Sequence, residues 1–190
     1  MTMDNSFVIK DNLKQVIGSL KQMDKAVRTA VLSSINRATQ RSKTEMGRKV
    51  KEKYIIKQAE VVKTISIRKA KGNALSATIT SKGHTIPLIG FGVTPRKRLK
   101  KPPKSVKAAV YRGGAKKPIP GAFIATAGSH LGVFERAGKK RLPIKELRGP
   151  AVPQMAGNEE VREHVQLVYG EEMQKRLPHE LNRTIGKVMG

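Results

Sequence analysis

Apolar residues recur every three or four positions at both ends of the chain, and every second position in its middle. From Asp24 to about Tyr54 a single stripe holds Val27, Ala30, Val31, Ser34, Ile35 and Ala38. This spacing predicts an amphipathic helix of at least four turns whose apolar stripe packs into the core. We expect Asp24 to begin the helix and Gly47 to mark a bend or a stop near its end.

Two further segments have helical spacing. The first is short and contains Leu13, Val16, Ile17 and Leu20. The second begins at Asn158, a typical N-cap residue, and has two glutamates in its first turn. Its apolar positions are Val161, Val165, Val168, Leu177, Leu181 and Ile185. Pro178 is expected to divide this helix in two.

Between the helices the period is close to two, which predicts short strands. The expected strands are 64–68, 75–80, 86–91, 106–111, 122–126 and 131–136, with turns at 71–73, 81–83 and 128–129. Residues 138–153, rich in Pro and Gly, are expected to be a long loop.

Because the strands cluster between helices, the sequence predicts an α+β fold. We expect a long N-terminal helix packed on an antiparallel sheet, with a long basic loop and C-terminal helices. The expected organisation is an N-terminal segment (1–22), an α+β core (23–157) with a basic loop at 94–105 and a Pro/Gly-rich loop at 138–155, and a C-terminal helical segment (158–190).

The charge is strongly uneven along the chain. The net charge is +25, and residues 61–134 hold 15 Lys and Arg but no Asp or Glu. Such a segment cannot neutralise itself through local ion pairs, so we expect a polyanion nearby.

The densest basic stretch runs from Pro95 to Lys107. Three prolines favour an extended arm or a long hairpin tip. Without Asn, Gln or aromatic residues among its cations, the stretch suits weak, sequence-blind phosphate contact, which many copies in one ring would strengthen. The expected nucleic-acid contacts are Arg96, Lys97, Arg98, Lys100, Lys101, Lys104, Lys107, Lys116 and Lys117. A nuclear-localisation signal, a membrane-surface patch and a solvated loop are the alternatives.

Catalytic chemistry has little support in the sequence. The chain has no Cys, its four His are far apart, and no phosphate loop, dinucleotide fingerprint or nucleophile elbow is present. We therefore expect no enzyme, no metal and no cofactor. We also expect no secretory signal and no membrane span, since the longest uncharged run, 118–134, is short and broken by Pro and Gly.

The most specific pattern follows the basic stretch. It consists of Ile119-Pro120-Gly121-Ala122-Phe123-Ile124-Ala125-Thr126, His130-Leu131-Gly132-Val133-Phe134-Glu135-Arg136, Arg141-Leu142-Pro143-Ile144 and Gly149-Pro150-Ala151-Val152-Pro153. This succession, with Ile35-Asn36-Arg37-Ala38 in the first helix, resembles the minor tail protein Z family of tailed phages. The similarity extends from about Phe7 to Arg183; Ala151 departs from it, since Ser is expected there.

The resemblance implies a non-enzymatic structural protein that completes the head-proximal end of a phage tail. It implies a six-fold homo-oligomeric ring at the neck of the virion, assembled in the host cytoplasm. The implied partners are tail terminator or tail tube proteins, head-tail connector proteins and the end of the double-stranded DNA, without a membrane. Loop 138–155 becomes the candidate docking segment, and the candidate subunit or ring contacts are Arg136, Lys139, Lys140, Arg141, Leu142, Pro143 and Ile144. The four cations of this set are alternatively a second basic patch that lines the channel of the ring.

A different class of function is also compatible with the sequence. A general nucleic-acid-binding protein, for example a ribosomal-type protein, could carry the same extended basic arm.

Overall fold

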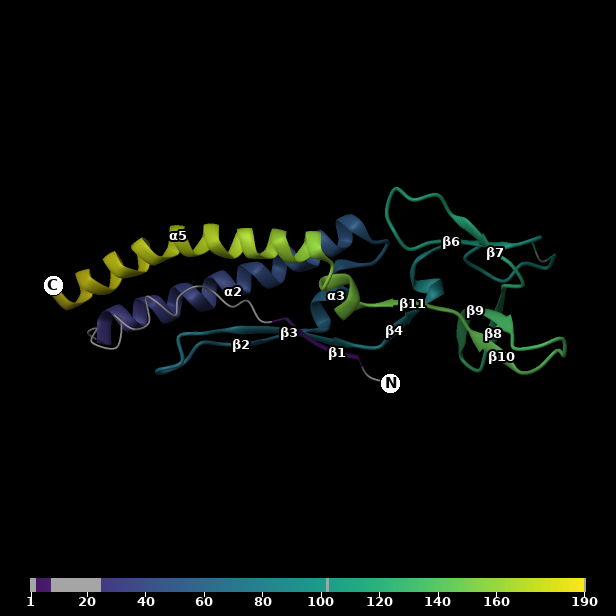
Figure 1. Ribbon diagram of the computed structural model, residues 1–190, viewed down its shortest axis with the longest axis horizontal. Coiled ribbons are helices and arrows are strands. Elements are labelled where there is room, and N and C mark those ends of the chain that lie inside the picture. Colours follow the sequence, from purple (N-terminus) through teal and green to yellow (C-terminus); the bar gives the residue numbers. More distant parts are fainter. Residues whose placement is uncertain (1–2, 8–24, 102, 190) are drawn as a thin grey trace.

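The computed structural model describes residues 3–7, 25–101 and 103–189. The molecule is elongated, with two long helices and a small sheet at one end and further small sheets at the other (Figure 1). The predicted helical segment around residues 13–20 lies outside the described residues.

The two long helices are α2 (Lys25–Lys53) and α5 (Glu159–Met189), and they pack side by side in antiparallel orientation (Figure 1). Four small residues spaced four apart on α2 are fully buried: Ala30, Ser34, Ala38 and Ser42. Three of these residues belong to the predicted apolar stripe, so both the helix and the burial of its stripe are confirmed. Small side chains let neighbouring elements approach the α2 backbone closely.

Charged residues fasten the two ends of this helix pair. At the end of α2, the Lys53 ammonium lies 2.6 Å from the Glu160 carboxylate and donates a 2.8 Å hydrogen bond to Asn158. Towards the other end, Glu180 of α5 is fully buried and its carboxylate lies 3.2 Å from the Arg37 guanidinium and 2.7 Å from that of Arg183.

Helix α5 is continuous through Pro178, so the predicted division was wrong. Proline in a helix removes one N–H and crowds the preceding turn. Here Leu177 packs against the apolar cluster of α2 and Glu180 pairs with Arg37, so contacts on both sides of the proline keep the helix together.

Of the bend or stop predicted at Gly47, the stop is wrong, because α2 continues to Lys53. Short helix α3 (Gln58–Lys63) packs across it, and a Cβ at position 47 would lie 2.8 Å from a methyl carbon of Val62. The glycine therefore permits a close helix contact.

A three-stranded antiparallel sheet of order β1-β3-β2 lies against the helix pair (Figure 1). Its strands are β1 (Met3–Phe7), β2 (Ile65–Arg68) and β3 (Thr78–Gly83). The predicted turn at 81–83 was wrong, because these residues continue β3 and pair with residues 3–5 of β1. The connection between β2 and β3 contains Gly72, at φ +59°, within the turn predicted at 71–73.

Residues 92–146, which we call the β lobe, form two more antiparallel sheets at the far end. One has the order β5-β6-β7, with β5 (Gly92–Thr94), β6 (Val106–Ala109) and β7 (Lys117–Ile119). The other has the order β10-β9-β8, with β8 (Phe123–Ala127), β9 (His130–Arg136) and β10 (Ile144–Glu146). Strands β5 and β7 were not predicted, because each has only three residues.

Between the two ends lie β4 (Thr85–Pro87), the 3₁₀ turn η1 (Leu88–Gly90), β11 (Arg148–Ala151) and α4 (Val152–Ala156). Residues 86–91 are therefore only partly strand. Residues 138–155 were predicted to be a loop, but they contain β10, β11 and most of α4. Ala151, Val152 and Met155 are buried, so only 137–143 remains an exposed connection.

One apolar core joins the two ends. It includes Met46 and Val50 of α2, Phe91 and Val93 near β5, and Val133 of β9, all nearly inaccessible to solvent. The α+β fold with a long first helix, antiparallel sheets and a C-terminal helix is thus confirmed.

The buried Glu180 generates a pH prediction. The hydrogen bond from Arg183 is the main cause that lowers the pKa of Glu180 below its usual range. A lowered pKa stabilises the folded state above the unfolded pKa of about 4.3, and this contribution is lost as the pH falls through the folded value. At pH 7, Glu180→Gln removes the ion pairs with Arg37 and Arg183 and should lower the free energy of unfolding by about 1–2 kcal/mol. The loss is no larger because both guanidiniums can turn to water. Urea unfolding should show this difference shrinking below pH 4; a difference that stays constant to pH 2 would contradict it.

The packing of Gly149 generates a second prediction. A Cβ there would lie 2.5 Å from a ring carbon of the buried Phe91, whereas one at Gly138 meets no atom within 4 Å. Gly149→Ala should lower the free energy of unfolding by about 1–3 kcal/mol. The control Gly138→Ala should stay within about 0.5 kcal/mol of the original chain. Equal effects in thermal unfolding would refute the packing argument.

Candidate nucleic-acid interface

The basic stretch is the connection of an antiparallel hairpin. It leaves β5 at Thr94 and returns in β6 at Val106, and the two strands pair along Gly92–Thr94 and Lys107–Ala109. Of the two forms expected for the stretch, the hairpin tip is the one observed. All nine predicted nucleic-acid contacts are exposed: Arg96, Lys97, Arg98, Lys100, Lys101, Lys104, Lys107, Lys116 and Lys117.

Two of these cations tie the base of the loop to the β lobe. The Arg96 guanidinium donates a 3.1 Å hydrogen bond to the backbone carbonyl of Phe91. The Lys116 ammonium, from the turn before β7, donates a 2.5 Å hydrogen bond to the Thr94 hydroxyl. The loop therefore starts from a fixed position.

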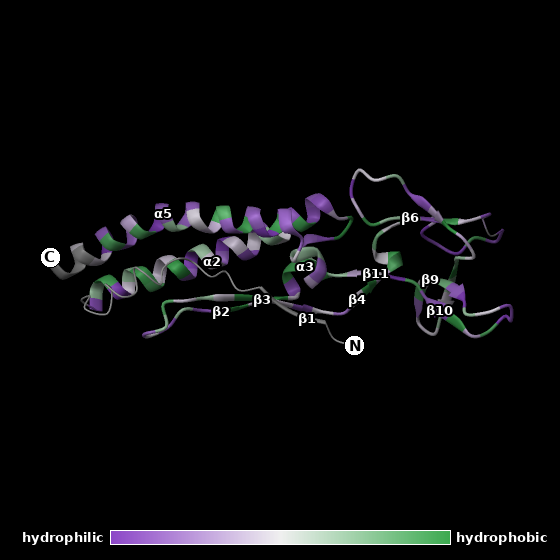
Figure 2. Ribbon diagram, viewed as in Figure 1, coloured by the Kyte–Doolittle hydropathy of each residue, from purple (hydrophilic) through white to green (hydrophobic). Residues whose placement is uncertain are grey.

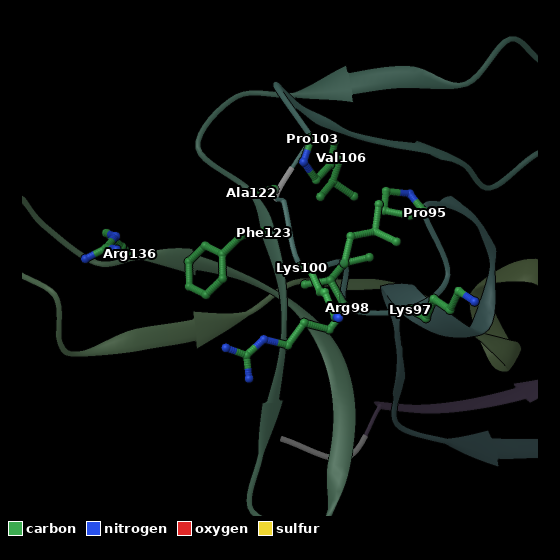
Figure 3. A pocket seen from close by; sticks show the side chains of 11 residues that line it. Pro95, Lys97, Arg98, Lys100, Pro103, Val106, Ala122, Phe123 and Arg136 are labelled. Carbon is green, nitrogen blue, oxygen red and sulfur yellow. The ribbon is translucent and has the colours of Figure 1, made fainter.

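A pocket of about 300 Å³ lies beneath the loop (Figure 3). Lys97, Arg98 and Lys100 from the loop and Arg136 from β9 line it, together with apolar residues and no carboxylate. The apolar lining is Pro95, Leu99, Pro103, Val106, Ala122, Phe123 and Ile124. A pocket lined by both apolar side chains and cations suits a ligand that is itself apolar with negative charges beside it.

Arg136 was predicted as a subunit or ring contact, and the structure brings it to the basic loop. Its guanidinium carbon lies 5.8 Å from the centre of the Phe123 ring, close enough for a cation–π contact. Phe134 of β9 pairs with Phe123 of β8, and the centres of their rings are 6.4 Å apart. Sequence reasoning missed this pocket, because Arg98 and Arg136 are far apart along the chain.

The other predicted subunit contacts form a separate tip. Lys139, Lys140, Arg141, Leu142 and Pro143 are exposed in the connection between β9 and β10, and Ile144 is half-buried at the start of β10. Figure 2 shows that the loops at this end of the molecule are largely hydrophilic.

The carboxylates of the β lobe do not balance its charge. It contains 15 Lys and Arg but only Glu135 and Glu146, whereas α2 and α5 together hold 14 against eight. Glu146 is moreover engaged, because its oxygens lie 2.7 Å from the His130 ring nitrogen and 2.8 Å from the Arg148 guanidinium. The positive charge is therefore concentrated at one end of an elongated molecule.

The described residues contain no group of three or more His, Cys, Asp or Glu side chains placed to hold a metal ion. Within the same part of the chain, none of the helices combines the length and apolar character that crossing a bilayer requires.

Comparison with known proteins identifies the class. Residues 10–189 match a family model of structural proteins of the phage tail. The model describes prophage minor tail protein Z (GPZ), and the chain belongs to this family. Searches of curated proteins and of solved structures gave no significant match. As a tail protein it is part of the virion and assembles with other virion proteins.

Proposed function

We propose that this tail protein forms a ring at the head-proximal end of the tail, where it completes the tail and contacts the end of the phage DNA. The observation that carries the proposal is the concentration of exposed cations on the β lobe of an elongated tail protein. In such a ring the β lobes of the subunits point towards the central channel.

The chemistry of the β lobe suits contact with the DNA backbone rather than with bases. Residues 92–146 contain no Asn and no Gln, two side chains that commonly read base edges. One hairpin loop that neutralises a few phosphates binds DNA weakly, with a dissociation constant of about 10⁻⁴–10⁻⁶ M. Several loops around one DNA end act together through effective concentration, yet contacts with phosphates still let the DNA slide.

The proposed protein partners are the tail terminator or tail tube on one side and the head-tail connector on the other. The exposed tip around Lys139, Lys140, Arg141 and Leu142 supports this part of the proposal, since it projects from the β lobe without covering the core. Leu142 is 66% exposed, which suits a contact with a neighbouring ring.

A first test measures DNA binding. We would replace Lys101, Lys104, Lys107 and Lys117 by Ser, because these exposed cations neither line the pocket nor anchor the loop. Affinity for double-stranded DNA should fall about tenfold or more at low salt, and the slope of log K against log salt should decrease by up to about 0.9 per lost phosphate contact.

The control has the same loss of charge at the helical end, with Lys25, Lys69, Lys71 and Lys175 replaced by Ser; all four are exposed. Both variants should keep the melting temperature of the original chain. If both variants lose affinity and salt slope equally, the β lobe is not the DNA-contacting surface.

A second test is electron microscopy of phage particles that carry a tagged copy of the chain. The proposal expects a closed ring at the head-tail junction, and particles that lack the protein should have tails that fail to join heads. Location elsewhere on the tail would overturn it. A monomeric protein that binds nucleic acid outside the particle would instead favour a general nucleic-acid-binding protein.

A further inference from the structure

One face of α5 carries an exposed leucine between two exposed glutamates. Glu163, Leu167 and Glu171 are spaced four residues apart, so they lie on one side of the helix and span about 12 Å. Leu167 is 61% exposed, and it is one of four large apolar side chains that are exposed among the described residues. We call these three residues the α5 stripe.

The two glutamates of the α5 stripe differ from the other glutamates of the helix. Glu159, Glu160, Glu172 and Glu180 each lie within 3.3 Å of an Arg or Lys of the same chain. The side-chain carboxylates of Glu163 and Glu171 make no ion pair or hydrogen bond with any described residue. In a chain with 39 Lys and Arg, two carboxylates flanking an exposed leucine are thus left available to a partner.

The pocket of the β lobe has the complementary composition. Its apolar lining residues include Leu99, Phe123 and Ile124, and its charged lining residues are all cations. We propose that the Leu167 side chain of one copy inserts into the pocket of the next copy, where Glu163 and Glu171 meet the cations of the lining. The proposal rests on the ring put forward above and supplies the contact between its subunits.

The arrangement of the two patches fits a ring. The α5 stripe lies on the helical half of the molecule and the pocket in the β lobe (Figures 1 and 3). A contact between two different patches is heterologous, so each copy uses both patches and the copies form a closed ring when the rotation allows it. A pocket of about 300 Å³ is at the small end of the range for binding pockets, which suits a single apolar side chain.

A nucleic-acid base is a poorer occupant of this pocket. The face of the Phe123 ring is already approached by Arg136, and the lining contains no Asn, Gln, Ser or Thr side chain to pair with a base edge. The basic loop then has two separate roles. Lys97, Arg98 and Lys100 face the neighbouring subunit, whereas Lys101, Lys104 and Lys107 are left for DNA.

Cysteine cross-linking tests the contact directly, because the natural chain has no Cys. The test variant carries Leu99→Cys, in the pocket, and Leu167→Cys, in the α5 stripe. Mild oxidation of assembled tails should link its copies into a ladder of covalent multimers on a non-reducing gel. The control Leu99→Cys with Leu142→Cys places the second thiol at another exposed leucine, and it should give no ladder.

A ladder in the test variant alone supports the contact. Ladders in both variants, or in neither, would overturn it. The outcome is separate from that of the proposed function, because a ring seen by electron microscopy without this ladder would refute the contact and leave the ring standing.

Charge reversal gives a second readout. Arg98→Glu with Lys100→Glu should weaken self-association about tenfold or more, as should Glu163→Arg with Glu171→Arg, and all four changes in one chain should restore it. The control Lys101→Glu with Lys104→Glu changes the charge of the same loop outside the pocket and should leave self-association unchanged. Loss of DNA affinity with unchanged self-association in the Arg98 variant would overturn the proposal and assign the pocket to nucleic acid.

Discussion

The structure depends on one buried apolar contact, where the end of α2 meets the beginning of α5 and the short helix α4. Met46, Val50, Met155, Val161 and Val165 meet there, and each is fully buried. The same core continues into the β lobe, so the apolar contact holds together two ends with very different charge. Without it, a segment that contains almost no carboxylate would have little to oppose its self-repulsion.

The fold limits that repulsion by placement. Eleven of the fifteen Lys and Arg of the β lobe lie in the connections between its strands, exposed to water and salt, where charges more than about 10 Å apart are largely screened. Carboxylates instead gather near the helix pair, where Glu45 lies 2.9 Å from Arg48 and Glu160 lies close to two lysines. The excess of positive charge is therefore smaller where the helices pack, at 14 Lys and Arg against eight carboxylates, than in the β lobe, at 15 against two.

The sequence predicted the parts of the fold that have long local periodicity. The stripe through Ile35 and the N-cap at Asn158 located α2 and α5 to within a residue or two. Sequence reasoning failed where contacts between distant parts of the chain determine the local structure. Residues 81–83 have the composition of a turn but extend β3, because β1, near the start of the chain, pairs with them. The pocket was unpredictable for the same reason, since only the folded hairpins bring Arg136 to the basic loop.

The basic loop connects two neighbouring strands of one sheet, so the pairing of these strands does not depend on the length of the loop. Loop closure becomes only slowly less favourable as residues are added, by about 0.6 kcal/mol for each doubling. Insertions or deletions between Pro95 and Ser105 would thus leave the pairing of β5 with β6 unchanged. In the proposed ring, a change of loop length would alter the bore without a change in the core.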